Sequence, residues 1–173
     1  MRINRTVRVG VPLDDAWRLV GPGFADVDRW ASNVFVSTQR SDARAPQAAP
    51  VGGRVCATPQ GEFDEAILAY DEDRHRVAYS VKGAAIPGFV RSIAAEWNLK
   101  SRGDKVTDVT MTMEADITQP FAFLMGWMMK KQFGKAIDET FEEYKHYLET
   151  GRLHPRKTKS NGSKKAQKAR AAA

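Results

Sequence analysis

The residues that could do chemistry stand on segments with the alternation of β-strands, in the middle of the chain. Glu65 lies between Phe63 and Ile67 on one side of such a segment, where a carboxylate needs a partner or takes a raised pKa. Tyr70 and Tyr79 are further groups that could donate or accept a proton. Glu65, Tyr70 and Tyr79 are therefore the candidate catalytic residues, for acid/base chemistry inside an apolar pocket.

Glu65 also has a purely structural interpretation. Its neighbours Ala66 and Leu68 are apolar too, so alternation does not decide which face of this strand is inside. On the outer face, Glu65 would form a solvated cross-strand ion pair.

Other chemistries find little support in the residue spacing. His75 stands at a predicted turn, His146 on a helix face away from its apolar stripe, and His154 beyond that helix, so no histidine is placed to activate a nucleophile. Cys56 is the one cysteine, which excludes an internal disulfide and fits a reducing compartment. No metal-ligand spacing and no glycine-rich phosphate loop is found, so we expect no metal and no cofactor.

Aromatic and methionine side chains are the candidates for lining a ligand pocket. Methionine adapts to irregular partners, although it also fills ordinary cores. Phe24 and Trp30, on a short predicted helix, could form a pocket mouth or simply cap the core. The predicted ligand-binding set is Phe24, Trp30, Tyr79, Trp97, Met111, Met113, Phe123, Met129 and Phe133.

The longest helical pattern in the chain covers residues 118–151 and must position these side chains. Thr118 is a possible N-cap, Pro120 suits the first turn, and Gly151 can end the helix. From residue 133 onward the apolar residues follow one stripe, as expected for a helix lying on a sheet. The stripe consists of Phe133, Ile137, Phe141, Tyr144 and Leu148.

Residues 121–129 are apolar on every side of this helix. Such a segment must be buried on more than one face, or line a cavity or an interface. A cavity is the first interpretation. A homodimer contact or docking to a membrane surface, with Lys130 and Lys131 at the edge, is the alternative.

Upstream, the sequence predicts a first strand over residues 3–11, two short helices over 12–20 and 24–32, and about six more strands. Five of those six cover 53–58, 62–71, 75–82, 89–100 and 105–117, after one that begins at Val34. Short connections between consecutive strands favour antiparallel pairing. We therefore predict an α+β fold, in which an antiparallel sheet of about seven strands wraps around the long C-terminal helix.

The charge is distributed unevenly along the 173 residues. The formal net charge is +6, yet residues 152–173 hold eight Lys/Arg and no Asp/Glu, which leaves 19 Lys/Arg against 21 Asp/Glu in residues 1–151. We predict a domain over 1–151 and a basic disordered tail over 152–173. Such a tail can hold nucleic acid or an anionic membrane weakly, or simply aid solubility.

The N-terminal residues lack the apolar core of a signal peptide, and no apolar run approaches the roughly 20 residues that cross a bilayer. A cytoplasmic protein is the expectation.

Several short motifs follow one another in a familiar order. They are VPLDDAWRLV, GFADVDRWAS, GGRVC, AYDEDRHRVAYSV, WNL and VTMTM. Together, over residues 3–151, they resemble the START-like (SRPBCC) helix-grip superfamily, specifically its bacterial polyketide cyclase/dehydrase and lipid-transport type. The resemblance implies a hydrophobic cavity between sheet and C-terminal helix that binds lipids, hormones, polyketides or other apolar molecules. A minority of members catalyse cyclisation or dehydration, and no universal catalytic signature can be carried over.

Three hypotheses follow. The first is a carrier or sensor that binds a small hydrophobic molecule. The second is a cyclase/dehydrase-type enzyme using Glu65, Tyr70 or Tyr79. The third is an interaction module whose basic tail contacts nucleic acid or an anionic membrane.

Overall fold

Seven strands form a single antiparallel sheet in the order β1–β7–β6–β5–β4–β3–β2. The computed structural model describes residues 1–40 and 44–172. The strands are β1 (Arg2–Val9), β2 (Val36–Gln39), β3 (Gly53–Thr58), β4 (Gly61–Asp71), β5 (Arg76–Lys82), β6 (Val90–Gly103) and β7 (Val106–Ile117). The predicted α+β fold with a sheet of about seven strands is confirmed.

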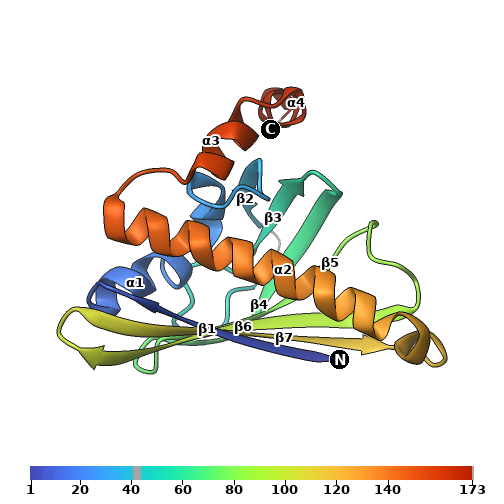
Figure 1. The fold of residues 1–173 in the computed structure, drawn as a ribbon, viewed down its shortest axis with the longest axis horizontal. Coiled ribbons are helices and arrows are strands. Elements are labelled where there is room, and N and C mark those ends of the chain that lie inside the picture. Colours follow the sequence, from blue (N-terminus) through green and yellow to red (C-terminus); the bar gives the residue numbers. More distant parts are fainter. Residues whose placement is uncertain (41–43, 173) are drawn as a thin grey trace.

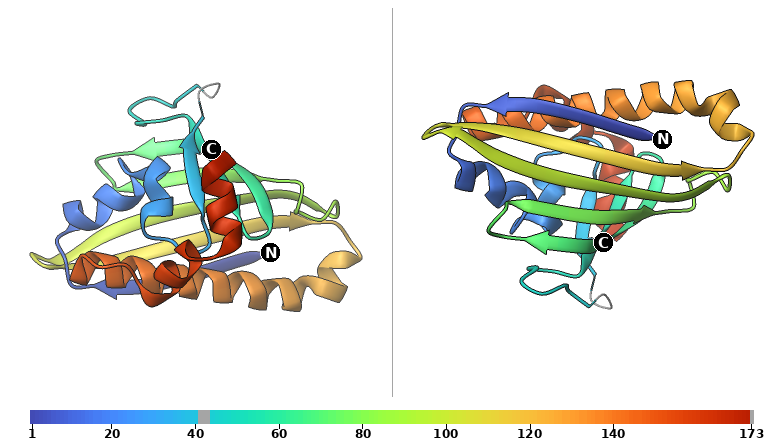
Figure 2. Two further views of the ribbon diagram at one scale, coloured as in Figure 1. Left: turned by 90° about the horizontal axis from the view of Figure 1, so that it is seen from above. Right: turned by 90° about the horizontal axis from the view of Figure 1, so that it is seen from below.

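The helices lie on one face of this sheet, which we call the inner face (Figures 1 and 2). They are α1 (Leu13–Val20), η1 (Phe24–Arg29), α2 (Phe121–Thr150), α3 (Pro155–Asn161) and α4 (Lys164–Ala172). The second small helix is a 3₁₀ helix that ends at Arg29, three residues earlier than predicted. No helix among the described residues is long and apolar enough to span a bilayer.

Helix α2 runs along β1 and β7, at one edge of the sheet (Figure 2). Its C-terminus is at Gly151, whose φ of 67° and N–H bond to the Tyr147 carbonyl make the expected left-handed cap. At the other end, Thr118 does not cap the helix: its hydroxyl donates to the Phe89 carbonyl, 3.0 Å away. This bond ties the start of α2 to the β5–β6 loop.

Aromatic rings fill the centre of the space between α2 and the inner face. Trp97 on β6 contacts Phe141 and Tyr144 of α2, each with ring centroids 5.6 Å apart. Trp30, just after η1, meets Tyr144 edge-on at 5.5 Å. These four residues are buried, so the middle of the domain is a packed core.

The segment after Gly151 differs from the prediction of a disordered tail, because it forms α3 and α4 above β2 (Figure 1). Arg156 donates to Glu143 of α2, a carboxylate that is almost fully buried. Lys157 is buried as well and donates to the Val34 carbonyl, 2.8 Å away. The contacts of Arg156 and Lys157 with residues far away in the sequence therefore hold this segment in place. Such contacts cannot be predicted from a run of like charge.

Burial of Lys157 lowers the pKa of its ammonium group to about 8. Between about pH 8 and pH 10.5 the unfolded chain therefore binds more protons than the folded one, and stability contributed at this site rises with pH. Relative to Lys157→Met, the wild-type free energy of unfolding should gain about 1–3 kcal/mol across that interval. Urea titrations at several pH values would measure the difference, and parallel pH profiles of the two proteins would contradict it.

Candidate functional site

A buried ion pair is the central polar feature of the inner face. Arg54 on β3 and Glu65 on β4 are direct cross-strand partners, and the Arg54 Nε lies 2.6 Å from Glu65 Oε2. The two side chains are only 8% and 14% exposed. Arg54 also donates to the Phe24 carbonyl of η1. The pair therefore joins the sheet to the small helix above it.

Two aromatic rings enclose the guanidinium group of Arg54. Its Cζ lies 4.1 Å from the centre of the Phe24 ring and 5.6 Å from that of Tyr79, which is cation–π geometry. Burial, and then the negative charge of Glu65, raise the pKa of the Tyr79 phenol. Tyr79 therefore keeps its proton at neutral pH and is suited to donate a hydrogen bond.

Cys56, next but one to Arg54 on the same strand, is buried. Burial raises the pKa of its thiol to about 11, although the charge of Arg54 opposes the shift. A thiol that stays protonated at neutral pH is a poor nucleophile. The polar cluster thus contains no activated nucleophile.

Beside this cluster, the inner face is apolar and incompletely covered. Val81 stands directly opposite Glu65 in the β4–β5 ladder. Val81, Met113 on β7 and Phe133 on α2 are half-buried, and each packs against both of the apolar clusters that make up the core. We call these three residues the apolar seam. Val81 also borders a cavity of about 240 Å³ at the base of the β5–β6 loop.

The structure distributes the predicted ligand-binding residues over several places. Phe24 and Tyr79 enclose Arg54, while Met113 and Phe133 belong to the seam. Buried positions in the core are occupied by Trp30, Trp97 and Met111, and Met129 is buried in the smaller apolar cluster beneath α2.

Phe123 does not face the sheet, because its side chain is 84% exposed. Trp30 has a buried indole N–H without a hydrogen-bond partner among the described residues. An unsatisfied buried donor costs about 1–3 kcal/mol, so this indole is an unfavourable feature of an otherwise apolar core.

Of the three candidate catalytic residues, Glu65 and Tyr79 lie together and Tyr70 lies apart. The Tyr70 hydroxyl bonds to Glu72, which also accepts from the Trp17 indole at 2.9 Å. The Tyr70 ring packs on Trp17 of α1, with ring centroids 5.5 Å apart. Tyr70 therefore belongs to the contact between α1 and the β4–β5 turn.

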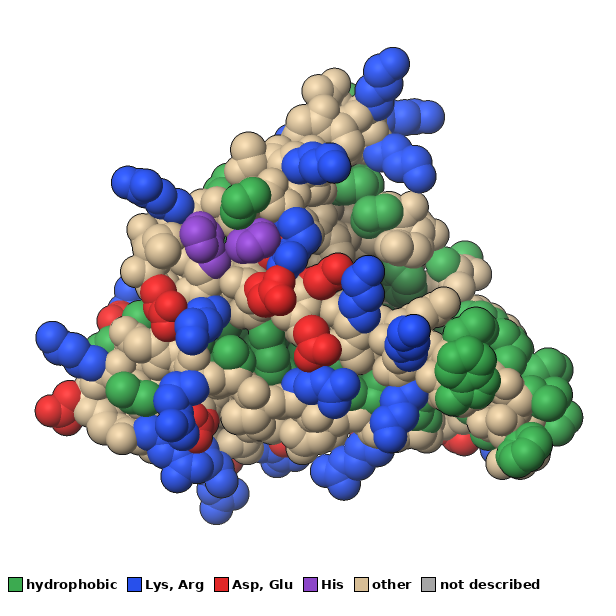
Figure 3. Space-filling model, viewed as in Figure 1, with side chains coloured by type: hydrophobic (Ala, Val, Ile, Leu, Met, Phe, Trp, Pro, Cys, Tyr) green, Lys and Arg blue, Asp and Glu red, His purple; other side chains and the backbone are tan. Residues whose placement is uncertain are grey.

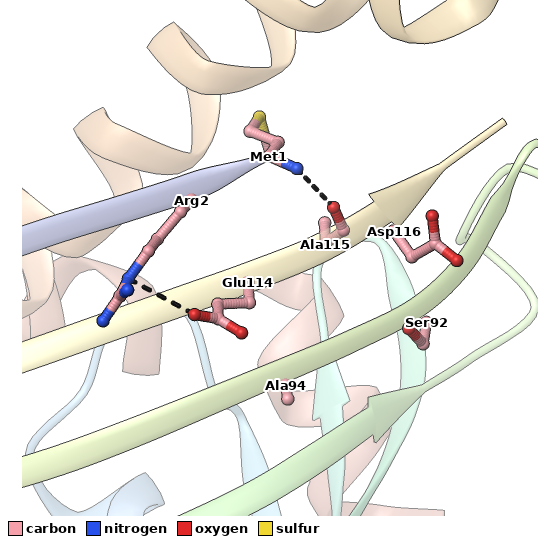
Figure 4. Close-up of a pocket in the computed structure, with 7 residues that line it drawn as sticks. All are labelled: Met1, Arg2, Ser92, Ala94, Glu114, Ala115 and Asp116. Atoms are coloured by element: carbon pink, nitrogen blue, oxygen red, sulfur yellow. Dashed lines mark hydrogen bonds and ion pairs between the residues drawn. The ribbon is translucent and has the colours of Figure 1, made fainter. Parts of the chain in front are cut away.

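Two further cavities are remote from the polar cluster. One, of about 580 Å³, lies between α1, η1 and the end of α2, and its wall includes Tyr147 and Leu148. The other, of about 360 Å³, is an open depression on the outer face (Figure 4). There, Arg2 pairs with Glu114 at 3.3 Å and the Met1 amino group donates to the Ala115 carbonyl. Among the described residues, no group of three or more His, Cys, Asp or Glu could hold a metal ion.

Sequence reasoning missed Arg54, the residue that neutralises Glu65. Charged strand residues are mostly exposed, so an arginine in this segment suggests a solvent-facing position. The G-x-R signal within GGRVC was the available hint. Val81 was missed as well, because one valine among many carries no distinguishing pattern.

Comparison with solved structures supports the fold. A START superfamily protein from Mycobacterium smegmatis superimposes with a TM-score of 0.68 at 13% identity, covering 87% of this chain and 99% of that one. A protein from Thermobifida fusca superimposes with a TM-score of 0.61 at 24% identity, and the superposition covers 88% of this chain and 97% of that one. Norcoclaurine synthase from Thalictrum flavum superimposes with a TM-score of 0.61 at 14% identity, and the superposition covers 81% of this chain and 83% of that one.

A search of curated proteins finds no match to this sequence. Residues 1–149 match the family described as polyketide cyclase / dehydrase and lipid transport. That match covers the whole sheet and nearly all of α2. The chain therefore belongs to the polyketide cyclase/dehydrase and lipid transport family, with a START-like helix-grip fold.

Proposed function

We propose that this protein binds one small hydrophobic molecule, of lipid, polyketide-like or aromatic type, between α2 and the inner face, and acts as a carrier or sensor. The observation that carries the proposal is the apolar seam. Residues at the junction of two core clusters are normally packed out of reach of solvent, yet Val81, Met113 and Phe133 remain partly exposed. Accessible apolar surface beside a few fixed polar groups is typical of small-molecule sites.

The polar cluster next to the seam gives the expected ligand a second feature. Because Glu65 faces Val81 across the β4–β5 ladder, a molecule lying on the seam would reach the cluster with one end. Tyr79, two residues from Val81 on the same side of β5, offers a proton for a hydrogen bond. An apolar ligand with one oxygen-bearing end fits this arrangement best.

The electrostatics favour binding over catalysis. The Glu65 carboxylate is already engaged by Arg54, and Tyr79 and Cys56 hold their protons through burial. A general base should have a pKa near the working pH and a free lone pair. Met113 in the seam can adjust to ligands of different shape, as a carrier or sensor requires.

A cyclase/dehydrase-type enzyme is the second candidate, supported by the proximity of Glu65 and Tyr79 inside an apolar site. If Glu65 transfers a proton, Glu65→Gln should reduce turnover of a cyclisable substrate by about 10²–10⁴-fold. Equal turnover by wild type and Glu65→Gln would remove Glu65 from the chemistry.

The binding proposal is tested by titrating the protein with N-phenyl-1-naphthylamine, a neutral fluorescent probe of apolar sites. Met113→Trp fills the seam with a larger side chain and should weaken probe binding by about tenfold or more, since a ligand and an indole cannot share the space. Thr112→Trp, the adjacent position on the outer face of β7, is the matched control and should bind like wild type. Equal affinity in all three proteins would contradict a site at the seam.

A further inference from the structure

A second apolar surface, separate from the seam, covers the end of the molecule where α2 begins. Phe121, Phe123, Leu124 and Trp127 are 40%, 84%, 61% and 70% exposed. The ring of Phe121 stacks on Phe89 with centroids 4.7 Å apart. The β5–β6 loop, residues 83–89 (GAAIPGF), thus adjoins the first turns of α2. We call the four exposed residues and this loop the apolar end surface; it is the large green area over the start of α2 in Figure 3.

The surroundings of this surface carry positive charge. Residues 82–95 and 117–137 contain no Asp or Glu. Lys82 and Arg91 flank the loop, and Lys130 and Lys131 follow Trp127 on α2; all four are exposed. Arg91 pairs with Asp116, 3.7 Å away. The other three cations have no ion pair among the described residues that would neutralise them.

Helix geometry places the apolar and basic groups on one side of α2. Phe123, Trp127 and Lys131 are spaced by four residues and therefore line one face. Met129 and Phe133, on the other side, pack onto the sheet. The first half of α2 is consequently apolar toward both the protein and the solvent, with lysines only at the margin of its outer face.

We propose that the apolar end surface docks on a lipid bilayer that contains anionic lipid. Exposed Phe, Leu and Trp side chains next to Lys and Arg are the composition of helices that lie in the headgroup region, and Trp favours that interface. Lys82, Arg91, Lys130 and Lys131 would face lipid phosphates. Cations at such positions are attracted to an anionic surface.

Charge also argues against a second copy of the chain as the partner of the apolar end surface. In a two-fold symmetric contact the same patch meets itself, so Lys82, Lys130 and Lys131 of one copy would face those of the other. No carboxylate from residues 82–95 or 117–137 is available to offset them. A bilayer with anionic headgroups supplies the missing negative charge. This inference stands whether or not the seam holds a ligand.

Binding to vesicles tests the proposal in the full-length protein. All four tryptophans are described by the structure; Trp17, Trp30 and Trp97 are buried and Trp127 is 70% exposed, so a change of emission on binding reports mainly Trp127. Vesicles of phosphatidylcholine mixed with phosphatidylglycerol should sediment the protein and shift its emission to the blue. Vesicles of phosphatidylcholine alone should do so far less, and salt should weaken the binding.

Two double variants and one control separate the contributions. Phe123→Ser with Leu124→Ser, and Lys130→Glu with Lys131→Glu, should each weaken binding to the mixed vesicles by at least about tenfold. Lys164→Glu with Lys165→Glu makes the same charge change on exposed residues of α4 and should leave binding within about twofold.

Three results would overturn the proposal. The first is vesicle binding that the α2 variants leave unchanged. The second is binding that only the α4 variant abolishes, because the C-terminal segment would then be the contact. The third is a dimer in analytical ultracentrifugation that Phe123→Ser with Leu124→Ser dissociates, because a second copy would then be the occupant.

Discussion

Glu65→Ala is expected to lower the free energy of unfolding by about 3–5 kcal/mol, because it leaves the guanidinium of Arg54 buried without its carboxylate. Arg54 is 7% exposed, and its other polar and aromatic partners among the described residues are the Phe24 carbonyl and the rings of Phe24 and Tyr79. These neutral partners cannot replace a counter-charge. Urea denaturation followed by far-ultraviolet circular dichroism measures the loss.

The matched control is Glu114→Ala, which removes the carboxylate of the Arg2–Glu114 pair on the outer face. That pair is 68% and 59% exposed, so its loss should cost at most about 1 kcal/mol. Replacing both Arg54 and Glu65 with methionine should recover much of the stability, since no buried charge then remains unpaired. Equal losses of stability for Glu65→Ala and Glu114→Ala would mean that the Arg54–Glu65 pair is solvated. That result would contradict the buried polar group at one end of the proposed site.

Trp97→Ala is expected to cost about 3–5 kcal/mol of stability, the usual range for removing a large buried aromatic side chain. Trp97 is 4% exposed and joins the sheet to α2 through Phe141 and Tyr144. The void left behind would be lined by apolar groups, and such voids accept small apolar molecules. A folded Trp97→Ala protein should therefore bind N-phenyl-1-naphthylamine at least as tightly as wild type.

Trp127→Ala removes the same side chain from the surface and serves as control. Because Trp127 is 70% exposed, its loss should change the free energy of unfolding by no more than about 0.5 kcal/mol. Similar destabilisation by the two substitutions would contradict the packed centre described for the inner face.

Local patterns were sufficient to predict most of the fold. Alternation in β7 and the stripe from Phe133 to Leu148 are consequences of strand and helix geometry. Alternation predicted β7 to within one residue of its observed bounds, whereas the predicted helix over 118–151 begins three residues before α2 and ends one residue after it. The antiparallel pairing from β3 to β7 follows from short connections between neighbouring strands, whereas the pairing of β1 with β7 joins residues about 100 positions apart in the sequence. Apart from the β1–β7 pairing, these features depend on residues close together in the sequence.

The parts of the structure that spacing did not predict depend on contacts between distant residues. The C-terminal segment is helical because Arg156 meets Glu143 and Lys157 meets the Val34 carbonyl, contacts that a run of basic residues conceals. Residues 121–129 are apolar all round, so periodicity does not say which side meets the sheet. In the structure, Phe123 faces the solvent.

The site itself was predicted only in outline. Glu65 and Tyr79 were identified individually, but Arg54 was needed to show that the carboxylate is compensated. Whether the space under α2 is open or filled depends on side-chain volumes in three dimensions. Trp97, Phe141 and Tyr144 fill its centre, which confines the proposed ligand to the seam beside the β5–β6 loop.

Native mass spectrometry of the protein with oleate tests most directly whether the seam holds a small apolar molecule. We expect wild type and Thr112→Trp to carry one non-covalent oleate that is released on denaturation, and Met113→Trp to remain bare. A wild-type spectrum without bound oleate, or the same bound mass in Met113→Trp, would contradict the proposed site.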